Sequence, residues 1–218
     1  MEHIKIMQAI QWIEDELLPS LCVNSESSDD PVVASGIPQG WQLLGTGNYA
    51  AVVARGDSPW IAKVYARNRP GLDEEAEVYR RLGPHPAYAA CYYKGDGYLI
   101  LKRLYGTNLY DCLLHGISIP PSVIRDVDEA LAYARSRGLN PRDIHGKNIF
   151  NDKGKGKVVD VSDFLLEGSD HVWRDTRQAY HWIYRPISAV CTIRLSEPML
   201  ERLRKLYRRF RKRSRHEH

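Results

Sequence analysis

The sequence predicts an α+β protein with a strand-rich first half and a helix-rich second half, arranged as two lobes. From residue 41 to residue 101, short apolar runs of strand length alternate with turns, whereas beyond residue 108 apolar residues recur at helical spacing. The change falls near Gly106 and Thr107. A chain of 218 residues can bury the core of one domain or of two small lobes. We expect an N-terminal helix and acidic linker (1–40), a strand-rich lobe (41–105), a helix-rich lobe (106–201) and a basic tail (202–218).

The first 40 residues are expected to form an amphipathic helix and a loop. Over residues 3–18 the apolar side chains are spaced by three or four positions: Ile4, Met7, Ile10, Ile13 and Leu17. Pro19 ends this helix, and the polar, acidic, serine-rich residues 24–30 are typical of a loop.

The strand-rich lobe contains three predicted strand regions and one helix. Apolar and polar residues alternate over residues 41–53, on both sides of a glycine-containing turn. Residues 60–65 are expected to form a short apolar strand, and residues 98–101 are an apolar run of strand length. Residues 73–82 have helical spacing.

The helix-rich lobe begins with a predicted helix over residues 123–137, capped by Gly138. Two short apolar segments, residues 148–150 and 158–161, flank a turn that contains Gly154 and Gly156. The remaining helices are expected at roughly 170–184 and 197–212.

Composition favours a soluble, cytoplasmic protein. No run approaches the roughly 18 to 20 apolar residues of a membrane span, and the N-terminal region lacks the basic start and apolar centre of a signal peptide. The four cysteines are dispersed without a CxxC pair, so they indicate neither a zinc site nor a redox pair. The net charge of +4 hides an asymmetry, because residues 202–218 hold nine Lys or Arg and one acid, leaving about −4 on residues 1–201.

The stretch from Asp143 to Asn148 is the most informative part of the sequence. An Asp and an Asn five positions apart can serve phosphoryl transfer, the Asp by orienting a nucleophile and the Asn by holding Mg²⁺. A short apolar strand then ends at Asp160, where a second metal ligand would be needed. These residues together predict a phosphoryl-transfer site.

The first lobe supplies candidate phosphate-binding groups. The segment from Gly45 to Val52 could be a turn whose glycines let backbone amides approach phosphates, although such glycines also occur in ordinary hairpins. Lys63 lies in an apolar strand and needs a partner if it points inward. Among the glutamates that open the next helix, Glu75 is the best candidate to pair with Lys63, because the apolar side of the helix would then face the sheet. The alternatives are an edge lysine and surface glutamates.

In this order, the parts resemble the protein kinase-like superfamily over about residues 41–185, and compact bacterial serine/threonine protein kinases in particular. The residues that carry the resemblance are Gly45 to Val52 for the glycine-rich loop, Lys63 for the lysine of the third strand, Glu75 for its helix partner, His85 and Pro86 for the following turn, residues 98–106 for the hinge, Pro141 to Asn148 for the catalytic loop, and Asp160 to Ser162 for the DFG motif. Pro141 replaces the usual histidine of the catalytic loop. The resemblance implies a bilobal fold with a β-rich N-lobe and a reduced helical C-lobe.

The resemblance also implies ATP- and Mg²⁺-dependent phosphoryl transfer to a hydroxyl acceptor. The catalytic residues would be Asp143, which orients the acceptor or takes its proton, Lys63, which contacts the α and β phosphates, and Glu75, which pairs with Lys63 and fixes it. Asn148 and Asp160 would hold Mg²⁺. The residues implied in ATP binding are Gly45, Thr46, Gly47, Asn48, Val52, Lys63, Leu101, Lys102 and Arg103, the last three through backbone carbonyls.

Three positions leave alternatives open. His145 differs from the lysine typical of eukaryotic protein kinases and resembles small-molecule and atypical bacterial kinases, and Lys147 could supply the missing charge. Asp163 is an alternative metal ligand to Asp160, which we prefer because it ends the apolar strand. Asp175 is a candidate for the helix carboxylate that supports the catalytic loop, a surface carboxylate being the alternative.

Three functions are compatible with these observations. The first is a minimal serine/threonine protein kinase, the second a kinase for a sugar, lipid or antibiotic hydroxyl, and the third a pseudokinase or binding module. Only 58 residues follow Asp160 and no APE-like element is present, so a full peptide-docking platform is not expected. The basic tail suits either an anionic partner or a closing helix packed by its apolar stripe.

Overall fold

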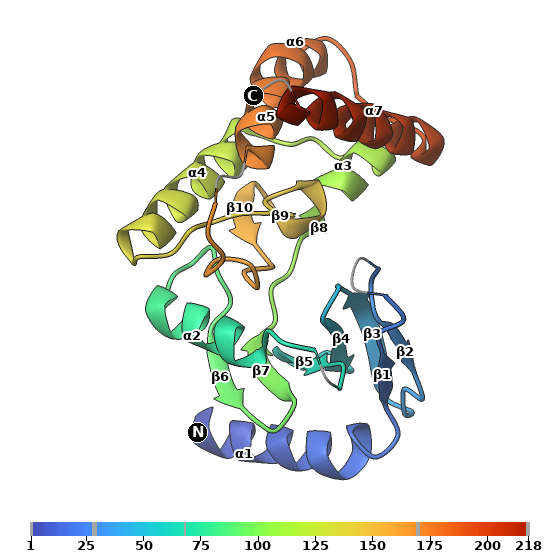
Figure 1. Cartoon of the computed structure of the whole chain (residues 1–218), viewed down its shortest axis with the longest axis vertical. Helices are drawn as coiled ribbons and strands as arrows, with labels where there is room; N and C mark the ends of the chain where they lie inside the picture. The colour runs from blue at the N-terminus through green and yellow to red at the C-terminus, as the bar shows by residue number, and fades with distance from the viewer. Residues whose placement is uncertain (1, 28–29, 68, 169–170, 217–218) are drawn as a thin grey trace.

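The computed structural model describes residues 2–27, 30–67, 69–168 and 171–216, and this part of the chain is a mixed α/β structure with several antiparallel sheets (Figure 1). The largest sheet has the order β3-β4-β5-β7-β6. Its strands are β3 (Trp41–Thr46), β4 (Ala50–Arg55), β5 (Trp60–Tyr65), β6 (Cys91–Lys94) and β7 (Tyr98–Lys102). Helix α2 (Leu72–Leu82) joins β5 to β6.

A three-stranded sheet of order β10-β9-β8 follows in the chain. It contains β8 (Thr107–Asn108), β9 (Ile149–Asp152) and β10 (Lys155–Val158). The elements around it are α3 (Leu109–His115), α4 (Pro121–Ser136) and the 3₁₀ turn η2 (Gly146–Asn148). The chain continues through α5 (Val172–Ala179), the π-helical turn η3 (Tyr180–Tyr184), α6 (Arg185–Ser188) and α7 (Glu197–His216). The five-stranded sheet and helices α5 to α7 therefore lie at opposite ends of the molecule (Figure 1).

The N-terminal segment packs on one face of the five-stranded sheet. Helix α1 (Glu2–Trp12) and the π-helical turn η1 (Ile13–Leu17) confirm the helix predicted for residues 3–18. Ile13 and Leu17 are fully buried in a cluster with Trp41 and Trp60. Glu16 accepts hydrogen bonds from Trp41 Nε1 at 3.2 Å and from Arg55 Nε at 3.1 Å. Strands β1 (Cys22–Asn24) and β2 (Val33–Ser35) pair as an antiparallel hairpin that we did not predict, so the loop expected at residues 24–30 begins inside β1, and residues 28 and 29 of that loop lie outside the described residues.

The alternation of β5 places Lys63 on the face opposite α1. Trp60, Ala62 and Val64 belong to the cluster that contains α1, whereas Tyr65 packs with α2 and with the second half of the chain. Because successive side chains of a strand point to opposite faces, Lys63 shares the face of Tyr65. Lys63 lies opposite Val52 of β4 and Leu99 of β7, well inside the sheet.

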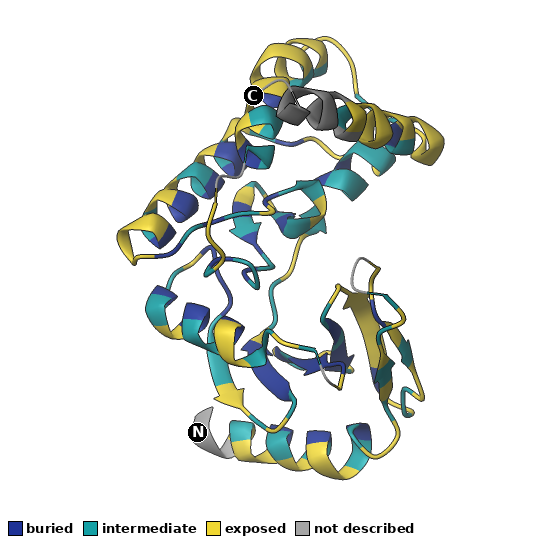
Figure 2. Cartoon of the chain, viewed as in Figure 1, coloured by how far each residue is buried: buried dark blue, intermediate teal, exposed yellow. Residues whose placement is uncertain are grey.

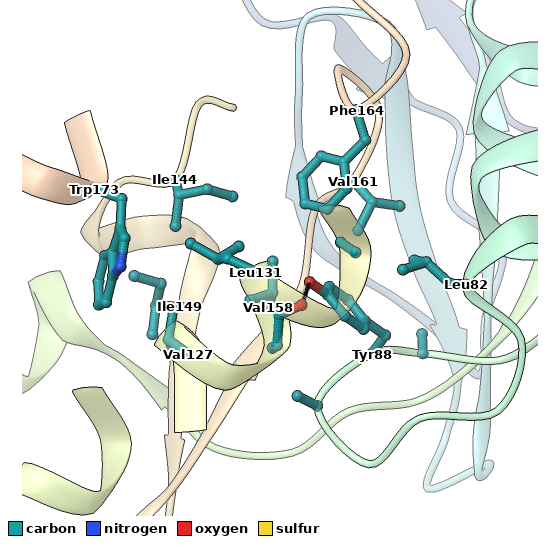
Figure 3. Close-up of a cluster of buried hydrophobic side chains, with 14 of the residues drawn as sticks. Leu82, Tyr88, Val127, Leu131, Ile144, Ile149, Val158, Val161, Phe164 and Trp173 are labelled. Atoms are coloured by element: carbon teal, nitrogen blue, oxygen red, sulfur yellow. Dashed lines mark hydrogen bonds between the residues drawn. The ribbon is translucent and has the colours of Figure 1, made fainter. Parts of the chain in front are cut away.

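The main core joins α2, α4 and the strands β9 and β10, and burial marks its path through the middle of the molecule (Figure 2). Leu131 of α4 lies in the same buried cluster as Val158, Ile149 and Ile144 (Figure 3). The Tyr88 hydroxyl donates to the Ala130 carbonyl at 2.8 Å and ties the segment after α2 to α4. Ile144 and Val161 are buried in this core, so the loops that carry the neighbouring Asp143 and Asp160 are anchored to it.

One glycine ends α4 and another allows β10 to pack closely on it. Gly138 has a left-handed backbone (φ +72°) directly after α4, which confirms the predicted cap. At Gly156 a Cβ atom would lie 2.3 Å from the Val123 carbonyl oxygen, so only glycine lets β10 approach the helix this closely.

The strand that we predicted to end at Asp160 is wrong in its bounds, because β10 spans Lys155–Val158 and ends two residues before Asp160. Val161 is buried in the core from a loop rather than from a strand. The apolar run therefore indicated burial correctly but not the strand bounds. Among the described helices, none is long and apolar enough to cross a membrane.

Candidate active site

The structure brings Lys63, Glu75 and Asp160 together. Lys63 Nζ lies 2.8 Å from Glu75 Oε1 and 2.7 Å from Glu75 Oε2, and it donates to Asp160 Oδ1 at 3.3 Å. The three residues come from β5, α2 and the loop after β10. The pairing of Lys63 with Glu75 is the one that we expected from the apolar side of the helix.

Glu75 is fully buried, and two groups satisfy its carboxylate. Besides Lys63, the Tyr65 hydroxyl donates to Glu75 Oε2 at 2.5 Å. A buried carboxylate without partners would be strongly destabilising, so this arrangement is needed for the helix to face the sheet. We did not predict Tyr65, although its position two residues after Lys63 on the same strand face indicates that it can reach the same group.

Burial and charge act in opposite directions on these groups. Burial alone would lower the pKa of Lys63, but the carboxylates of Asp160 and Glu75 raise it above its ordinary value, so the ammonium is kept. Burial raises the pKa of Glu75, an effect that Lys63 opposes. Burial alone would raise the pKa of Asp160, but Lys63 and the backbone N–H of Ser162 outweigh this effect, so the pKa of Asp160 lies below its ordinary value. The site therefore holds a fixed cation beside an ionised carboxylate.

Asp143 begins a loop that backbone hydrogen bonds define. Its backbone is left-handed (φ +56°), an uncommon conformation that Asp and Asn tolerate better than most residues. Its carbonyl oxygen accepts from His145 N at 3.0 Å and from Asn148 Nδ2 at 3.1 Å. The Asp143 side chain is 57% exposed, with its Oδ2 3.6 Å from His145 Nε2. Ile144 is buried and anchors the loop from below.

Asn148 is linked to the segment that carries Asp160. The backbone N–H of Val159 donates to the Asn148 carbonyl at 3.0 Å, so the two predicted metal ligands lie on neighbouring segments. Because the side-chain NH₂ of Asn148 faces the Asp143 carbonyl, its Oδ1 is the atom that could hold a cation.

Asp160 and Asp163 have different surroundings. Asp160 Oδ1 accepts from both Lys63 and the Ser162 N–H, the latter at 3.2 Å. Burial and the charge of Asp160 raise the pKa of Asp163. The carboxylate next to Lys63 is therefore Asp160, the one that we preferred from the sequence.

The turn from Gly45 to Val52 joins β3 to β4. Gly47 N donates to the Ala50 carbonyl at 2.9 Å and closes the turn. Neither Gly45 nor Gly47 has a positive φ, and a Cβ atom at Gly45 would meet nothing within 4 Å. The fold itself therefore does not require glycine at position 45, and the space above the backbone is open.

At the predicted hinge, the backbone amides have partners within the protein. Lys102 N donates to the Ala90 carbonyl at 2.8 Å and Arg103 N donates to the Pro59 carbonyl at 2.9 Å. These two amides therefore already have partners, and a contact of the backbone carbonyls of residues 101–103 with adenine stays a prediction. A hollow of about 750 Å³ lies beside this segment, lined by Tyr105, Thr107, Ile117 and the β9–β10 turn. None of the predicted site residues lines it, so we assign the site by its charged groups.

Asp175 contacts residues of the C-terminal helices, and among the described contacts none joins it to the predicted catalytic loop. Its side chain accepts from the Tyr207 hydroxyl at 2.9 Å and lies 3.3 Å from Arg174 Nε. Asp128 of α4, which we did not predict, instead links two elements: Trp173 Nε1 donates to it at 2.7 Å and Arg177 pairs with it at 3.3 Å. The structure therefore favours the alternative interpretation of Asp175, a carboxylate near the surface.

One curated protein provides a comparison. The chain is 35% identical over 147 residues to a protein of Bacillus subtilis (strain 168) named "Putative serine/threonine-protein kinase YrzF". The matched region covers 66% of this chain and 68% of that relative. No family model matches the chain.

Proposed function

The chain belongs to the kinase-like family of this Bacillus relative, and from that premise we propose that it is an ATP- and Mg²⁺-dependent phosphotransferase, a minimal serine/threonine protein kinase. The observation that carries the proposal is the Lys63–Glu75–Asp160 network, with Nζ-to-oxygen distances of 2.7 to 3.3 Å. Residues 63 and 160 are far apart in the sequence, burying a charged group is costly even when it is paired, and clusters of such groups are typical of functional sites. The bilobal arrangement, with an N-lobe at 41–105 and a reduced C-lobe at 106–201, is part of this proposal.

The donor groups suit ATP and Mg²⁺. Mg²⁺ prefers oxygen ligands, and a carboxylate with an amide oxygen is the combination that Asp160 and Asn148 provide. A fixed ammonium at Lys63 suits phosphate oxygens, and the open space at Gly45 suits a close approach of phosphate to the backbone. When bound, Mg²⁺ would neutralise charge on the phosphates.

Each residue then has a defined role in the proposed reaction. Lys63 positions the α and β phosphates, and Glu75 with Tyr65 keeps Lys63 in place. Asp143 orients the acceptor hydroxyl and takes its proton as the hydroxyl oxygen bonds to the γ phosphorus and the bond to the β-phosphate oxygen breaks, releasing ADP. Asn148 holds the Asp143 loop through the 3.1 Å bond from its Nδ2.

Nucleotide binding is tested by thermal unfolding with ATP, with and without Mg²⁺. We expect a stabilisation of about 2.7 kcal/mol at a ligand concentration of roughly a hundred times Kd, and only when Mg²⁺ is present. Asp160→Asn should lose the Mg²⁺-dependent part, whereas Asp163→Asn should retain it. The reverse result would assign the metal to Asp163, and equal stabilisation without Mg²⁺ in all three proteins would favour a binding module.

A small-molecule kinase is the second candidate. The observation that favours it is His145, whose Nε2 lies 3.6 Å from Asp143 Oδ2, in the position where this chain resembles small-molecule kinases. Transfer of labelled γ-phosphate to the protein itself or to generic protein substrates supports the first candidate. Transfer to sugar, lipid or antibiotic hydroxyls, with no labelling of proteins, would replace it with the second.

A further inference from the structure

The end of the molecule farthest from the five-stranded sheet exposes large apolar side chains. Helices α6 and α7 lie at this end, and α6 and the first turns of α7 are mostly exposed (Figures 1 and 2). Trp182 is 81% exposed, Ile183 61% and Val190 86%. All three belong to residues 182–190, and large exposed apolar patches are typical of interaction surfaces.

Helix α7 uses only part of its apolar stripe to pack on the protein. Leu200 is buried, and the Tyr207 hydroxyl donates to Asp175 of α5, so this side of α7 is attached to the rest of the molecule. Met199, Leu203 and Leu206 lie next to that side at helical spacing and are 51%, 49% and 60% exposed. The closing-helix interpretation therefore explains one part of the stripe and leaves the other part uncovered.

The remaining faces of α7 are strongly basic. Arg202, Arg204, Lys205 and Arg209 are exposed, and residues 202–218 hold nine Lys or Arg in total. Over the same helix the acidic side chains are Glu197 and Glu201 in its first turns. An exposed apolar stripe flanked by basic residues is the pattern of a helix that lies in the interface of an anionic bilayer.

We propose that α7, together with the exposed Trp182, Ile183 and Val190, binds the surface of a bilayer that contains anionic lipids. The basic side chains would meet lipid phosphates, while Leu203 and Leu206 would enter the acyl boundary. Nucleic acid would match the charge but has no use for the uncovered aliphatic groups. A second copy of the chain would bring two basic helices together, which like charge disfavours. This proposal does not depend on phosphotransferase activity.

The test is flotation of the full-length protein with phosphatidylcholine vesicles that contain or lack phosphatidylglycerol. We expect binding only with phosphatidylglycerol, and weaker binding as the salt concentration rises from about 0.1 to about 0.5 M. Leu203→Ser with Leu206→Ser should weaken binding at least about tenfold, because both leucines lose apolar burial in the lipid. Lys205→Glu with Arg209→Glu should weaken it by a similar factor.

The matched control is Met7→Ser, which removes a comparably exposed apolar side chain, 57% accessible, from α1 at the opposite end of the molecule. It should bind as the wild type does, and all variants should keep the wild-type unfolding temperature. Absence of vesicle binding would overturn the proposal, as would equal binding to neutral vesicles or wild-type binding by the leucine variant. Salt-sensitive RNA binding without vesicle binding would reassign the surface to nucleic acid. A wild-type protein that is dimeric in solution and a leucine variant that is monomeric would reassign it to a second copy of the chain.

Discussion

The two halves of the candidate site are built in different ways. Glu75 is fully buried and the Lys63 side chain is 11% exposed, whereas the Asp143 side chain is 57% exposed and that of His145 is 41% exposed. Ion pairs and a buried phenol hold the first half, while backbone hydrogen bonds and a left-handed residue shape the second. Folding therefore assembles Lys63 and Glu75, whether or not a substrate is bound. Asp143 is less buried, so replacing it should cost the fold less than replacing Lys63.

The largest effect is expected at Asp143. Asp143→Asn keeps a side chain that tolerates the left-handed backbone but removes the carboxylate, so phosphoryl transfer should fall by about 10²- to 10⁴-fold with little change in the unfolding temperature. Transfer of labelled γ-phosphate and thermal unfolding measure the two quantities. Asp73→Asn, at a side chain 79% exposed on α2, is the control and should retain activity. A variant that transfers phosphate at the wild-type rate would remove Asp143 from the reaction.

Substitutions in the buried half should lower the stability of the fold as well as the activity. Lys63→Met leaves the carboxylate of Glu75 buried without its ammonium, which we expect to cost about 3 to 5 kcal/mol of the free energy of unfolding. Replacing both residues, Lys63→Met with Glu75→Leu, should restore much of that stability, because neither charge is then buried alone. Neither variant should be stabilised by ATP with Mg²⁺. Urea unfolding distinguishes them, and an unchanged stability of Lys63→Met would show that the pair contributes nothing to the fold.

Tyr65 sharpens the comparison within the buried half. Tyr65→Phe removes the hydroxyl that donates to Glu75, at a cost of about 1 to 3 kcal/mol, and should lower phosphoryl transfer because Glu75 is less firmly placed. Tyr88→Phe is the matched control, since its hydroxyl is also buried but donates to the Ala130 carbonyl. Both variants should lose stability, measured by urea unfolding, and only Tyr65→Phe should lose activity. Equal activity in the two would make the Tyr65 hydroxyl structural alone.

The smallest expected effect is a pH dependence of stability from His85, which lies outside both halves. Burial lowers the pKa of His85 below its ordinary value of 6.5, so the unfolded chain takes up the proton more readily than the folded one. Stability should then fall as the pH drops below about 6.5 and be fully present above it. Urea unfolding at pH 7.5 and pH 5.5 should show a smaller difference for His85→Asn than for wild type. An equal difference in the two proteins would remove His85 as the cause of the pH dependence.

Much of the fold was predictable because its larger elements are amphipathic. Helices α2 and α4 and strands β5 and β7 have enough buried positions for their periodicity to appear in the sequence. Strand β6, the hairpin of β1 with β2, and the seven-residue helix α3 were missed, because each is short and buries few side chains. Their conformation depends on partners that are distant in the sequence.

The candidate site was predictable where chemistry restricts the residue type. A lysine inside an apolar strand and a glutamate on the apolar side of a helix need one another, so their pairing follows from burial. Asp128 and Asp175 could not be distinguished in this way, because both are helical carboxylates and only packing decides which of them meets Trp173 and Arg177. The catalytic and ligand-binding roles themselves stay predictions for the assays above.

The packing of α1 on the sheet also brings three of the five tryptophans of the molecule together. Trp12, Trp41 and Trp60 form one group, in which the ring centroids of Trp12 and Trp60 are 6.4 Å apart and those of Trp41 and Trp60 are 5.9 Å apart. Trp182, at 81% exposed, stands in solvent at the other end. The near-ultraviolet circular dichroism of the paired rings should therefore report the docking of the N-terminal helix, in addition to a contribution from the buried Trp173, while solute quenching of the long-wavelength fluorescence should report Trp182 at the opposite end.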